Sequence, residues 1–377
     1  MRISYPTKTE IGDRVKLATE VVSGPDRREL QYWLPLEYGD WFAADRCDGF
    51  VVGLLLQAMT RRENLEVEGP LSSRLFHSLQ AFFIPMMAQA FPDLHRVDII
   101  PSSLTETSTA GRYVATGFSG GIDSFAAVIQ HFVQEQSLDH RISHFLFNNA
   151  GSHGCNPDES RKLFCQRFEK LQPFAREIGL PVIAVDSNLH EVLPISFITM
   201  HSALNASVPL VLQNRVRRYY YASAFKYADC GVKWTDDLAR FDPLAFHLFS
   251  TEGLDCISTG CQMSRIEKTE LVASYEPSSR FLNVCVDPSF EGRNCSTCFK
   301  CCRTILTLEL LGVIDAYREV FDLERFSRVR NRYLSEVFRY SSGSFEHEIA
   351  DLIRQRGSKS LQSAFRVRKL WDRLAWR

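Results

Sequence analysis

The sequence predicts an α/β protein: a doubly wound parallel sheet with an extra N-terminal α+β module and a helical, zinc-bearing C-terminal region. Three observations lead to this prediction. Strand-like apolar runs alternate with helical stretches in the middle of the chain, which favours a parallel sheet covered by helices. A mixed pattern precedes them, and closely spaced cysteines followed by helical sequence come after them. We therefore expect three regions, at residues 1–110, 111–310 and 311–377.

The N-terminal module is expected to mix strands with helices. Residues 30–36 are apolar and aromatic, which is typical of a strand. Apolar residues at helical spacing over 71–91 predict one or two helices. A short strand is expected over 97–100, ended by Pro101. We find no catalytic motif in this module.

The central region is expected to contain the alternating strands and helices. Strands are predicted at residues 113–118, 145–149, 181–186 and 255–259, and helices from residue 125, over 158–178 and over 215–227. Ligands on doubly wound sheets bind at the carboxyl ends of the strands. The segments 119–124, 148–149 and 186–187 follow such ends, so we expect one cleft to collect them.

The most informative segment is SGGIDS at residues 119–124, here called the Ser/Gly loop. Between a strand and a helix, such a loop places unpaired N–H groups at a helix N-terminus, where the helix dipole also favours an anion. Glycines let the backbone approach a phosphate, and serine hydroxyls add donors. It is neither a GxxxxGK[ST] loop nor a GxGxxG loop. The alternative is an ordinary strand–turn–helix corner made of small residues.

Cys285, Cys295, Cys298 and Cys301 form the pattern C-x9-C-x2-C-x2-C. Thiolates suit zinc, and four of them fill its tetrahedron, so we expect a structural Zn²⁺ with no open position for water. The two C-x2-C steps place three sulfurs on one turn, and Cys285 is expected to close the site from a strand end. Two alternatives to zinc are an iron–sulfur cluster, which four cysteines can also hold, and a set of buried free cysteines that bind no metal. Cys302 is interpreted as a spare thiol.

Composition excludes some classes of function. The net charge is −1, so no overall electrostatic attraction to nucleic acids or membranes is expected, and no apolar run approaches the ~20 residues of a membrane span. Residues 1–6 lack a signal-peptide pattern, which predicts a reducing, cytoplasmic location. Residues 325–377 hold 13 Arg and Lys against 5 Asp and Glu. We interpret this basic stretch as a solvated helical face; contact with a nucleic acid or an acidic protein is the alternative.

The Ser/Gly loop matches SGGxDS, the pyrophosphate loop of the N-type ATP pyrophosphatases. Together with the cysteine pattern, it resembles the 7-cyano-7-deazaguanine synthase family over about residues 112–310. The resemblance implies an adenine nucleotide alpha-hydrolase-like fold, with ATP, Mg²⁺ and Zn²⁺ as cofactors. It implies an ATP-dependent C–N ligase that adenylates a carboxylate, 7-carboxy-7-deazaguanine or a related acid, and releases pyrophosphate. Amide or nitrile formation would follow.

The same resemblance assigns roles to residues of this chain. Lys268, in the segment 264–270, becomes a phosphate or carboxylate contact, with a surface lysine as the alternative. Arg215 tracks an arginine of the family and is expected on a middle helix, where it would stabilise the leaving pyrophosphate. Apart from the resemblance, His153 and His201 are candidates for proton transfer because histidine titrates near neutral pH, but we favour a non-catalytic, hydrogen-bonded histidine at each position. The implied cofactor-binding residues are Ser119, Gly120, Gly121, Asp123, as a Mg²⁺ partner, and Ser124, and the implied zinc ligands are Cys285, Cys295, Cys298 and Cys301.

The sequence departs from the family at 147–154 and at 211–215, where substrate recognition is expected, and it has both terminal regions in addition. Longer relatives associated with bacterial anti-phage systems have this general build and join a deazaguanine to a protein N-terminus. That reaction is one alternative; a tRNA-thiolating enzyme and a non-enzymatic nucleotide sensor are others. The expected partners are a deazaguanine-type acid and a protein or peptide N-terminus as acceptor. A nucleic acid is less favoured, and no membrane is expected.

Overall fold

The computed structural model describes residues 1–107, 111–154, 156–192, 199–235, 237–339, 345–356, 359 and 361. The chain divides into two compact units. The first consists of Met1–Phe118 and Gln130–Cys261, and the second of Ser119–Ile129 and Gln262–Arg377. The Ser/Gly loop and the four cysteines therefore belong to the second unit, whereas every strand of the described residues belongs to the first.

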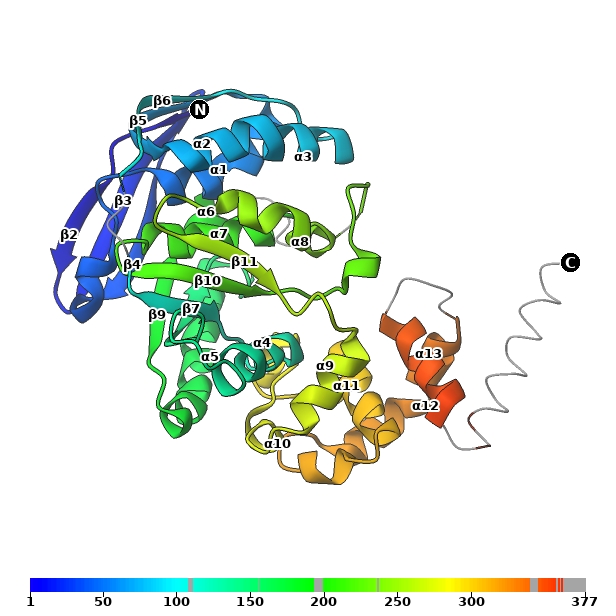
Figure 1. The fold of residues 1–377 in the computed structure, drawn as a ribbon. Coiled ribbons are helices and arrows are strands. Elements are labelled where there is room, and N and C mark those ends of the chain that lie inside the picture. The colour runs from blue at the N-terminus through cyan, green and yellow to red at the C-terminus, as the bar shows by residue number, and fades with distance from the viewer. Residues whose placement is uncertain are drawn as a thin grey trace, which may run out of the picture. The chain divides into compact units, whose positions relative to one another are not determined.

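The first unit is organised around one sheet (Figure 1). The described strands follow the order β11-β10-β7-β8-β9-β4-β3-β1-β5-β6, with β2 paired to β3. The strands are β1 (Arg2–Ile3), β2 (Thr7–Ile11), β3 (Arg14–Ser23), β4 (Asp26–Pro35), β5 (Leu65–Ser72), β6 (Ile99–Thr105), β7 (Tyr113–Gly117), β8 (His144–Asn149), β9 (Val182–Ser187), β10 (Val216–Ala222) and β11 (Asp255–Thr259).

From β11 to β9, each strand is parallel to the next one in the order, which confirms the predicted α/β class with a mostly parallel sheet. Asn149 at the end of β8 is aligned with Asp186 near the end of β9. The carboxyl ends of these two strands consequently lie at the same edge of the sheet. The finer assignment to a nucleotide-hydrolase fold remains a prediction.

The N-terminal strands extend this sheet. β4 pairs antiparallel with β9, through Tyr32 opposite Ser187, so position 110 does not separate two sheets. The strand expected to end at Pro101 instead continues through it as β6. That expectation was wrong because β6 is an edge strand of the sheet. Proline has no N–H to donate, but on the outer side of an edge strand there is no neighbouring strand to receive a hydrogen bond.

Two of the three helical segments expected in the first unit are helices in the structure, which also has helices that were not predicted. Within residues 215–227, expected to be helical, Val216–Ala222 form the strand β10 instead, because this segment pairs with β7 on one side and β11 on the other. The expected helices over 71–91 and 158–178 are confirmed as α2–α3 and α5. The helices are α1 (Asp48–Arg61), α2 (Ser73–Ser78), α3 (Ile84–Ala90), α5 (Pro157–Ile178), α6 (Leu189–Val192), α7 (His201–Val211) and α8 (Asp242–Ala245).

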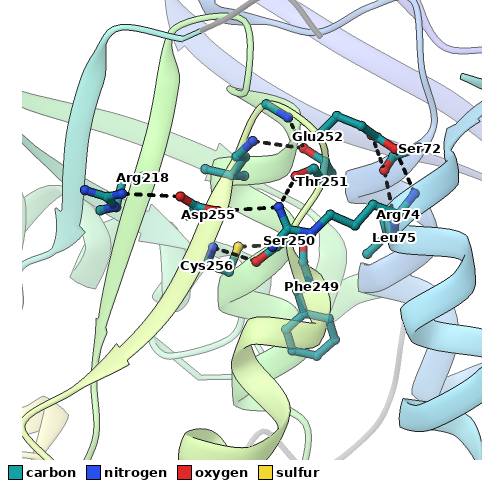
Figure 2. Close-up of polar contacts among 12 residues, drawn as sticks. Ser72, Arg74, Leu75, Arg218, Phe249, Ser250, Thr251, Glu252, Asp255 and Cys256 are labelled. Carbon is teal, nitrogen blue, oxygen red and sulfur yellow. Dashed lines mark hydrogen bonds and ion pairs between the residues drawn. The ribbon is translucent and has the colours of Figure 1, made fainter. Parts of the chain in front are cut away.

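A buried polar network fastens the N-terminal elements to the rest of the first unit. Asp48, fully buried at the start of α1, accepts hydrogen bonds from the Ser72 N–H and the Gln213 amide, both at 2.8 Å. Gln213 accepts in turn from the Thr251 hydroxyl. The Ser72 hydroxyl donates to Glu252 at 2.7 Å (Figure 2). Because buried polar groups are costly when unpaired, this network fixes how β5 and α2 dock beside the segment that precedes β11.

The described part of the second unit is helical. Its helices are α4 (Ile122–Val128), α9 (Arg265–Ala273), α10 (Ser278–Phe281), α11 (Phe299–Leu310), α12 (Leu323–Arg339) and α13 (Phe345–Arg356). In α12 and α13, several basic side chains are paired with acidic ones; Arg330, for example, binds Glu309 of α11. Most of residues 357–377, the second half of the basic stretch 325–377, lie outside the described residues. Its interpretation as a solvated helical face stays a prediction. Among the described residues, every helix is too short or too polar to cross a membrane.

Candidate functional site

The Ser/Gly loop leaves β7 and leads into α4, in the predicted strand–loop–helix context. Gly120 has φ +76°, a left-handed conformation that favours glycine. The Ser124 hydroxyl donates to the Gly121 carbonyl at 2.9 Å and lies 3.4 Å from the Ser119 hydroxyl. Gly121 precedes α4 and has no side chain to cap it. The first N–H groups of the helix, which have no partner within it, are thus suited to an anion.

Asp123, in the first turn of α4, contacts two cationic side chains of α9. Its Oδ2 lies 2.8 Å from the Arg265 guanidinium, and its Oδ1 lies 3.2 Å from Nζ of Lys268. Arg265 and Lys268 are three residues apart and therefore share one face of the helix. Lys268 is fully buried, whereas the Asp123 side chain keeps 24% of its surface exposed. The Asp123 carboxylate thus compensates the charge of a buried ammonium. The alternative interpretation of Lys268 as an ordinary surface lysine was wrong.

The two cations also control the protonation of Asp123. Burial alone would raise the pKa of Asp123, but Arg265 and Lys268 outweigh burial and hold that pKa below its ordinary value. The carboxylate is therefore ionised at neutral pH. Because each of its oxygens already contacts a cation, a Mg²⁺ ion at this position would compete with Arg265 and Lys268. The role of Asp123 as a Mg²⁺ partner stays a prediction.

The start of α9 explains why these two cations are fixed. Ser264 accepts a hydrogen bond from the Glu267 N–H at 3.2 Å, and Glu267 accepts one from the Ser264 N–H at 2.7 Å. This reciprocal pair is a capping box, which the spacing of serine and glutamate encodes locally. It defines where the helix begins and thereby sets the face on which Lys268 lies.

The four predicted cysteines come together in the second unit. Their sulfurs all lie within 4.8 Å of one another. The sulfurs of Cys285 and Cys298 are 3.9 Å apart, as are those of Cys295 and Cys301. A tetrahedral zinc with ~2.3 Å bonds separates its sulfurs by about 3.8 Å, whereas a disulfide requires ~2.0 Å. The cluster therefore fits a metal ion such as zinc, and the prediction of a four-cysteine site is confirmed at that level.

Backbone N–H groups point at these sulfurs, as suits thiolates. Cys295 Sγ accepts from the Cys298 N–H at 3.1 Å and from the Thr297 N–H at 3.4 Å. Cys285 Sγ accepts from the Asp287 and Cys295 N–H groups, both at 3.4 Å. Cys285 lies in a loop after α10, so the expected strand end was wrong. A strand is not required to place Cys285, because side-chain hydrogen bonds and N–H···S contacts hold its loop in place.

Asn283 connects the cysteine loop to the Ser/Gly loop within the second unit. Its N–H donates to the Gly120 carbonyl at 2.8 Å. Its side chain accepts from the Cys285 N–H at 3.3 Å and donates to the Gly292 carbonyl. A metal ion that fixes Cys285 would thereby also fix the residue that supports Gly120.

Comparisons of the chain with protein-family models, with curated proteins and with solved structures found no match. The resemblance to the deazaguanine synthase family therefore rests on the Ser/Gly loop and the cysteine spacing. Both features are local in sequence, and the structure places both in the second unit. Any activity assigned to the chain follows from this geometry and is a proposal.

Arg215 lies elsewhere than expected. It precedes β10 in the first unit, not on a helix, and its guanidinium pairs with Asp40 at 2.9 Å. The side chain is 41% exposed. Arg215 thus lies at the amino end of a parallel strand, opposite the carboxyl ends at which doubly wound sheets bind ligands. Its predicted contact with the leaving pyrophosphate has no support from this placement.

At the carboxyl edge of the first unit, the structure brings together two of the expected polar side chains. The Asn149 amide donates to Asp186 at 2.9 Å and accepts from the Ser160 hydroxyl at 3.0 Å.

His153 is buried against Phe147, and burial lowers the pKa of His153 to about 3. A histidine that stays neutral in an aromatic core is suited to packing and not to proton transfer.

His201 belongs to a polar cluster that the sequence did not predict. Its Nδ1 lies 2.8 Å from the Tyr221 hydroxyl and its Nε2 lies 3.1 Å from Asp237. Ser202, next on α7, donates to the buried Asp242. Burial raises the pKa of Asp242 to about 7. His201 and Ser202 share α7, whereas Tyr221 belongs to β10 and Asp242 to α8, so only the fold brings the cluster together.

Arg265 is the residue of the loop region to which sequence reasoning gave no role. It lies in the segment that suggested Lys268, and its contact with Asp123 is the shorter of the two. The available signal was its position three residues before Lys268, which places both cations on one helix face.

Proposed function

We propose that the chain binds ATP on the Ser/Gly loop and transfers AMP to a carboxylate, with release of pyrophosphate. The acid that we favour is 7-carboxy-7-deazaguanine or a related deazaguanine acid. The observation that carries the proposal is one arrangement inside the second unit: glycine-rich N–H groups at the start of α4 beside the cations of Arg265 and Lys268. Anions bind where unpaired N–H groups, a helix dipole and fixed cations coincide.

The loop residues would hold the outer phosphates of ATP. N–H groups of the Ser/Gly loop and the hydroxyls of Ser119 and Ser124 supply donors for the β- and γ-phosphates. Arg265 and Lys268 would stabilise the negative charge that grows on the departing pyrophosphate. Asp123 contacts both cations and would hold them beside the loop. Mg²⁺ bound with the nucleotide would neutralise further charge on the phosphates.

Two displacement steps make up the proposed reaction, and each forms one bond and breaks one. A carboxylate oxygen attacks the α-phosphorus, and the bond between that phosphorus and the bridging oxygen breaks, so that pyrophosphate leaves with the electron pair. An amine then attacks the acyl carbon, AMP leaves, and the amine loses a proton as the C–N bond forms. The four-cysteine site acts structurally, since four sulfur ligands leave no position for water on a zinc ion.

The identity of the amine separates two forms of the proposal. Ammonia would give an amide and, after dehydration with a second ATP, a nitrile. A protein N-terminus would give a stable amide link between a deazaguanine and that protein, as in the anti-phage alternative. Mass spectrometry of reactions that contain ammonium or a model peptide distinguishes them by the mass of the product.

The test is exchange of radiolabelled pyrophosphate into ATP by the purified chain with 7-carboxy-7-deazaguanine. We expect exchange that depends on the acid and is lost in Asp123→Ala and in Arg265→Gln. Arg280→Gln is the matched control for the second variant, because Arg280 is an exposed arginine of the same unit that is paired with Glu276. Release of phosphate without AMP or pyrophosphate would contradict the proposal.

Metal analysis tests the tRNA-thiolation alternative. We expect a colourless protein with stoichiometric zinc, because the sulfur spacing fits a single tetrahedral ion. A brown protein with visible absorption would instead favour an iron–sulfur enzyme. Unchanged biological activity of Asp123→Ala would favour a nucleotide sensor over an enzyme.

A further inference from the structure

Helix α13, from the C-terminal region, caps the start of α9. The carboxylate of Glu348 accepts hydrogen bonds from the Arg265 N–H at 2.8 Å and the Ile266 N–H at 3.4 Å. These N–H groups belong to the first turn of α9, where the helix itself provides no partner. Ser264 caps only the Glu267 N–H, so Glu348 completes the cap from a distant part of the chain. The backbone of Arg265 is therefore fixed by α13.

The side chain of Arg265 is fixed by the same helix. Its guanidinium lies 4.8 Å from the centre of the Phe345 ring, and the guanidinium of Arg303 lies 4.4 Å from that ring. Both distances suit a cation–π contact. Arg303 in turn binds Glu346 at 2.8 Å, with both side chains nearly buried. Phe345 is thus anchored between α9 and α11 and offers Arg265 a rigid surface.

Arg265 consequently joins α13 to the Ser/Gly loop. One side of its guanidinium contacts the Phe345 ring, and Nη1 contacts Asp123. An arginine side chain has considerable rotamer freedom, and holding it in one geometry before a ligand arrives lowers the entropy cost of binding. A displacement of α13 would remove both constraints on Arg265 at once.

We propose that α13 sets the affinity of the Ser/Gly loop for ATP, with Phe345 and Glu348 as positioning residues that act through Arg265. This inference rests on the proposed function. It adds a role for the C-terminal region, because the position of Arg265 beside the Ser/Gly loop depends on α13. Anything that moved α13 would weaken ATP binding without touching the nucleotide.

The experiment measures ATP affinity by calorimetry and the kinetics of pyrophosphate exchange. We expect Phe345→Ala and Glu348→Ala to weaken ATP binding about tenfold, with a matching rise in KM and little change in kcat at saturating ATP. Phe345→Tyr keeps the ring and Glu348→Gln keeps an acceptor oxygen, so both should restore most of the affinity. The matched control is Arg356→Gln, which removes an exposed contact of α13 with Glu270 of α9.

A double-mutant cycle shows whether the effect passes through Arg265. In an Arg265→Ala background, Phe345→Ala should change the ATP affinity by less than about twofold, because its target is gone. Equal effects in both backgrounds, or an affinity loss in Arg356→Gln as large as in Phe345→Ala, would overturn the inference. So would alanine variants that fold and bind ATP as the wild type does.

The outcomes separate this inference from the proposed function. A wild-type chain that binds ATP without exchange would refute adenylation of the acid tested, and the affinities of the variants would still decide the role of α13. A wild-type chain that binds no ATP would overturn both. Exchange in the wild type with unaltered affinities in the variants would overturn the role of α13 alone.

Discussion

The ion triad of Asp123, Arg265 and Lys268 predicts an asymmetry between two substitutions. Asp123→Asn removes the negative charge that faces two cations at once, the Arg265 guanidinium and the fully buried Lys268 ammonium. Lys268→Met replaces the cation with an apolar side chain of similar length. The Arg265 guanidinium, 2.8 Å from Asp123, still compensates the carboxylate. We therefore expect the first substitution to destabilise the protein strongly and the second only mildly.

The magnitude follows from the distances. At 3.2 Å and an effective dielectric constant of ~20, the attraction between Asp123 and Lys268 is about 5 kcal/mol before desolvation is counted. Removing one partner of a buried pair costs ~3–5 kcal/mol. Because the Asp123 side chain is 24% exposed, we expect about 3 kcal/mol for Asp123→Asn. Lys268→Met should cost ~1 kcal/mol or less, since the methionine refills the space of the buried alkyl chain.

Urea denaturation of the wild type and both variants measures the difference as a change in midpoint at constant slope. Equal stability of Asp123→Asn and wild type, or a larger loss in Lys268→Met than in Asp123→Asn, would refute the reasoning. The pH dependence provides a second check. The pKa of Asp123 is lowered in the folded state, so its stabilisation is present above the unfolded pKa and is lost as the pH falls through the folded pKa. This loss in acid should be smaller in Lys268→Met.

Three further predictions concern single side chains. Ser124→Ala should lower kcat/KM for pyrophosphate exchange at least about tenfold but cost only ~1 kcal/mol of stability, because the Gly121 carbonyl keeps its backbone partner; an unchanged rate would remove Ser124 from the loop's function. Cys298→Ser should lose the metal and lower the melting temperature, whereas Cys302→Ser, outside the cluster, should keep both; equal metal contents would count against the site. Asp242→Asn should stabilise the protein increasingly as the pH rises toward about 7, since burial raises the pKa of Asp242 and its ionisation opposes folding; a stability difference independent of pH would contradict this.

The features predicted correctly from sequence are those that depend on neighbouring residues. Residues 119–124 contain the glycine that permits φ +76° and the serine that bonds back to the loop. The close spacing of the last three cysteines is matched by sulfurs that lie within 4.8 Å of one another. The mistaken helix at β10 shows the limit of local reasoning: isolated apolar and aromatic residues fit either period, and pairing with β7 and β11 decided the outcome.

Local sequence encodes the Ser/Gly loop, the capping box of α9 and the close spacing of Cys295, Cys298 and Cys301, because backbone conformation and short-range hydrogen bonds act within a few residues. Which groups meet at these features depends on the tertiary fold. It placed Arg265 and Lys268 on Asp123, Asn283 under Gly120, and Arg215 at the amino end of a strand in the other unit. Contacts between distant segments depend on how apolar faces pack, and residue spacing along the chain carries no record of them.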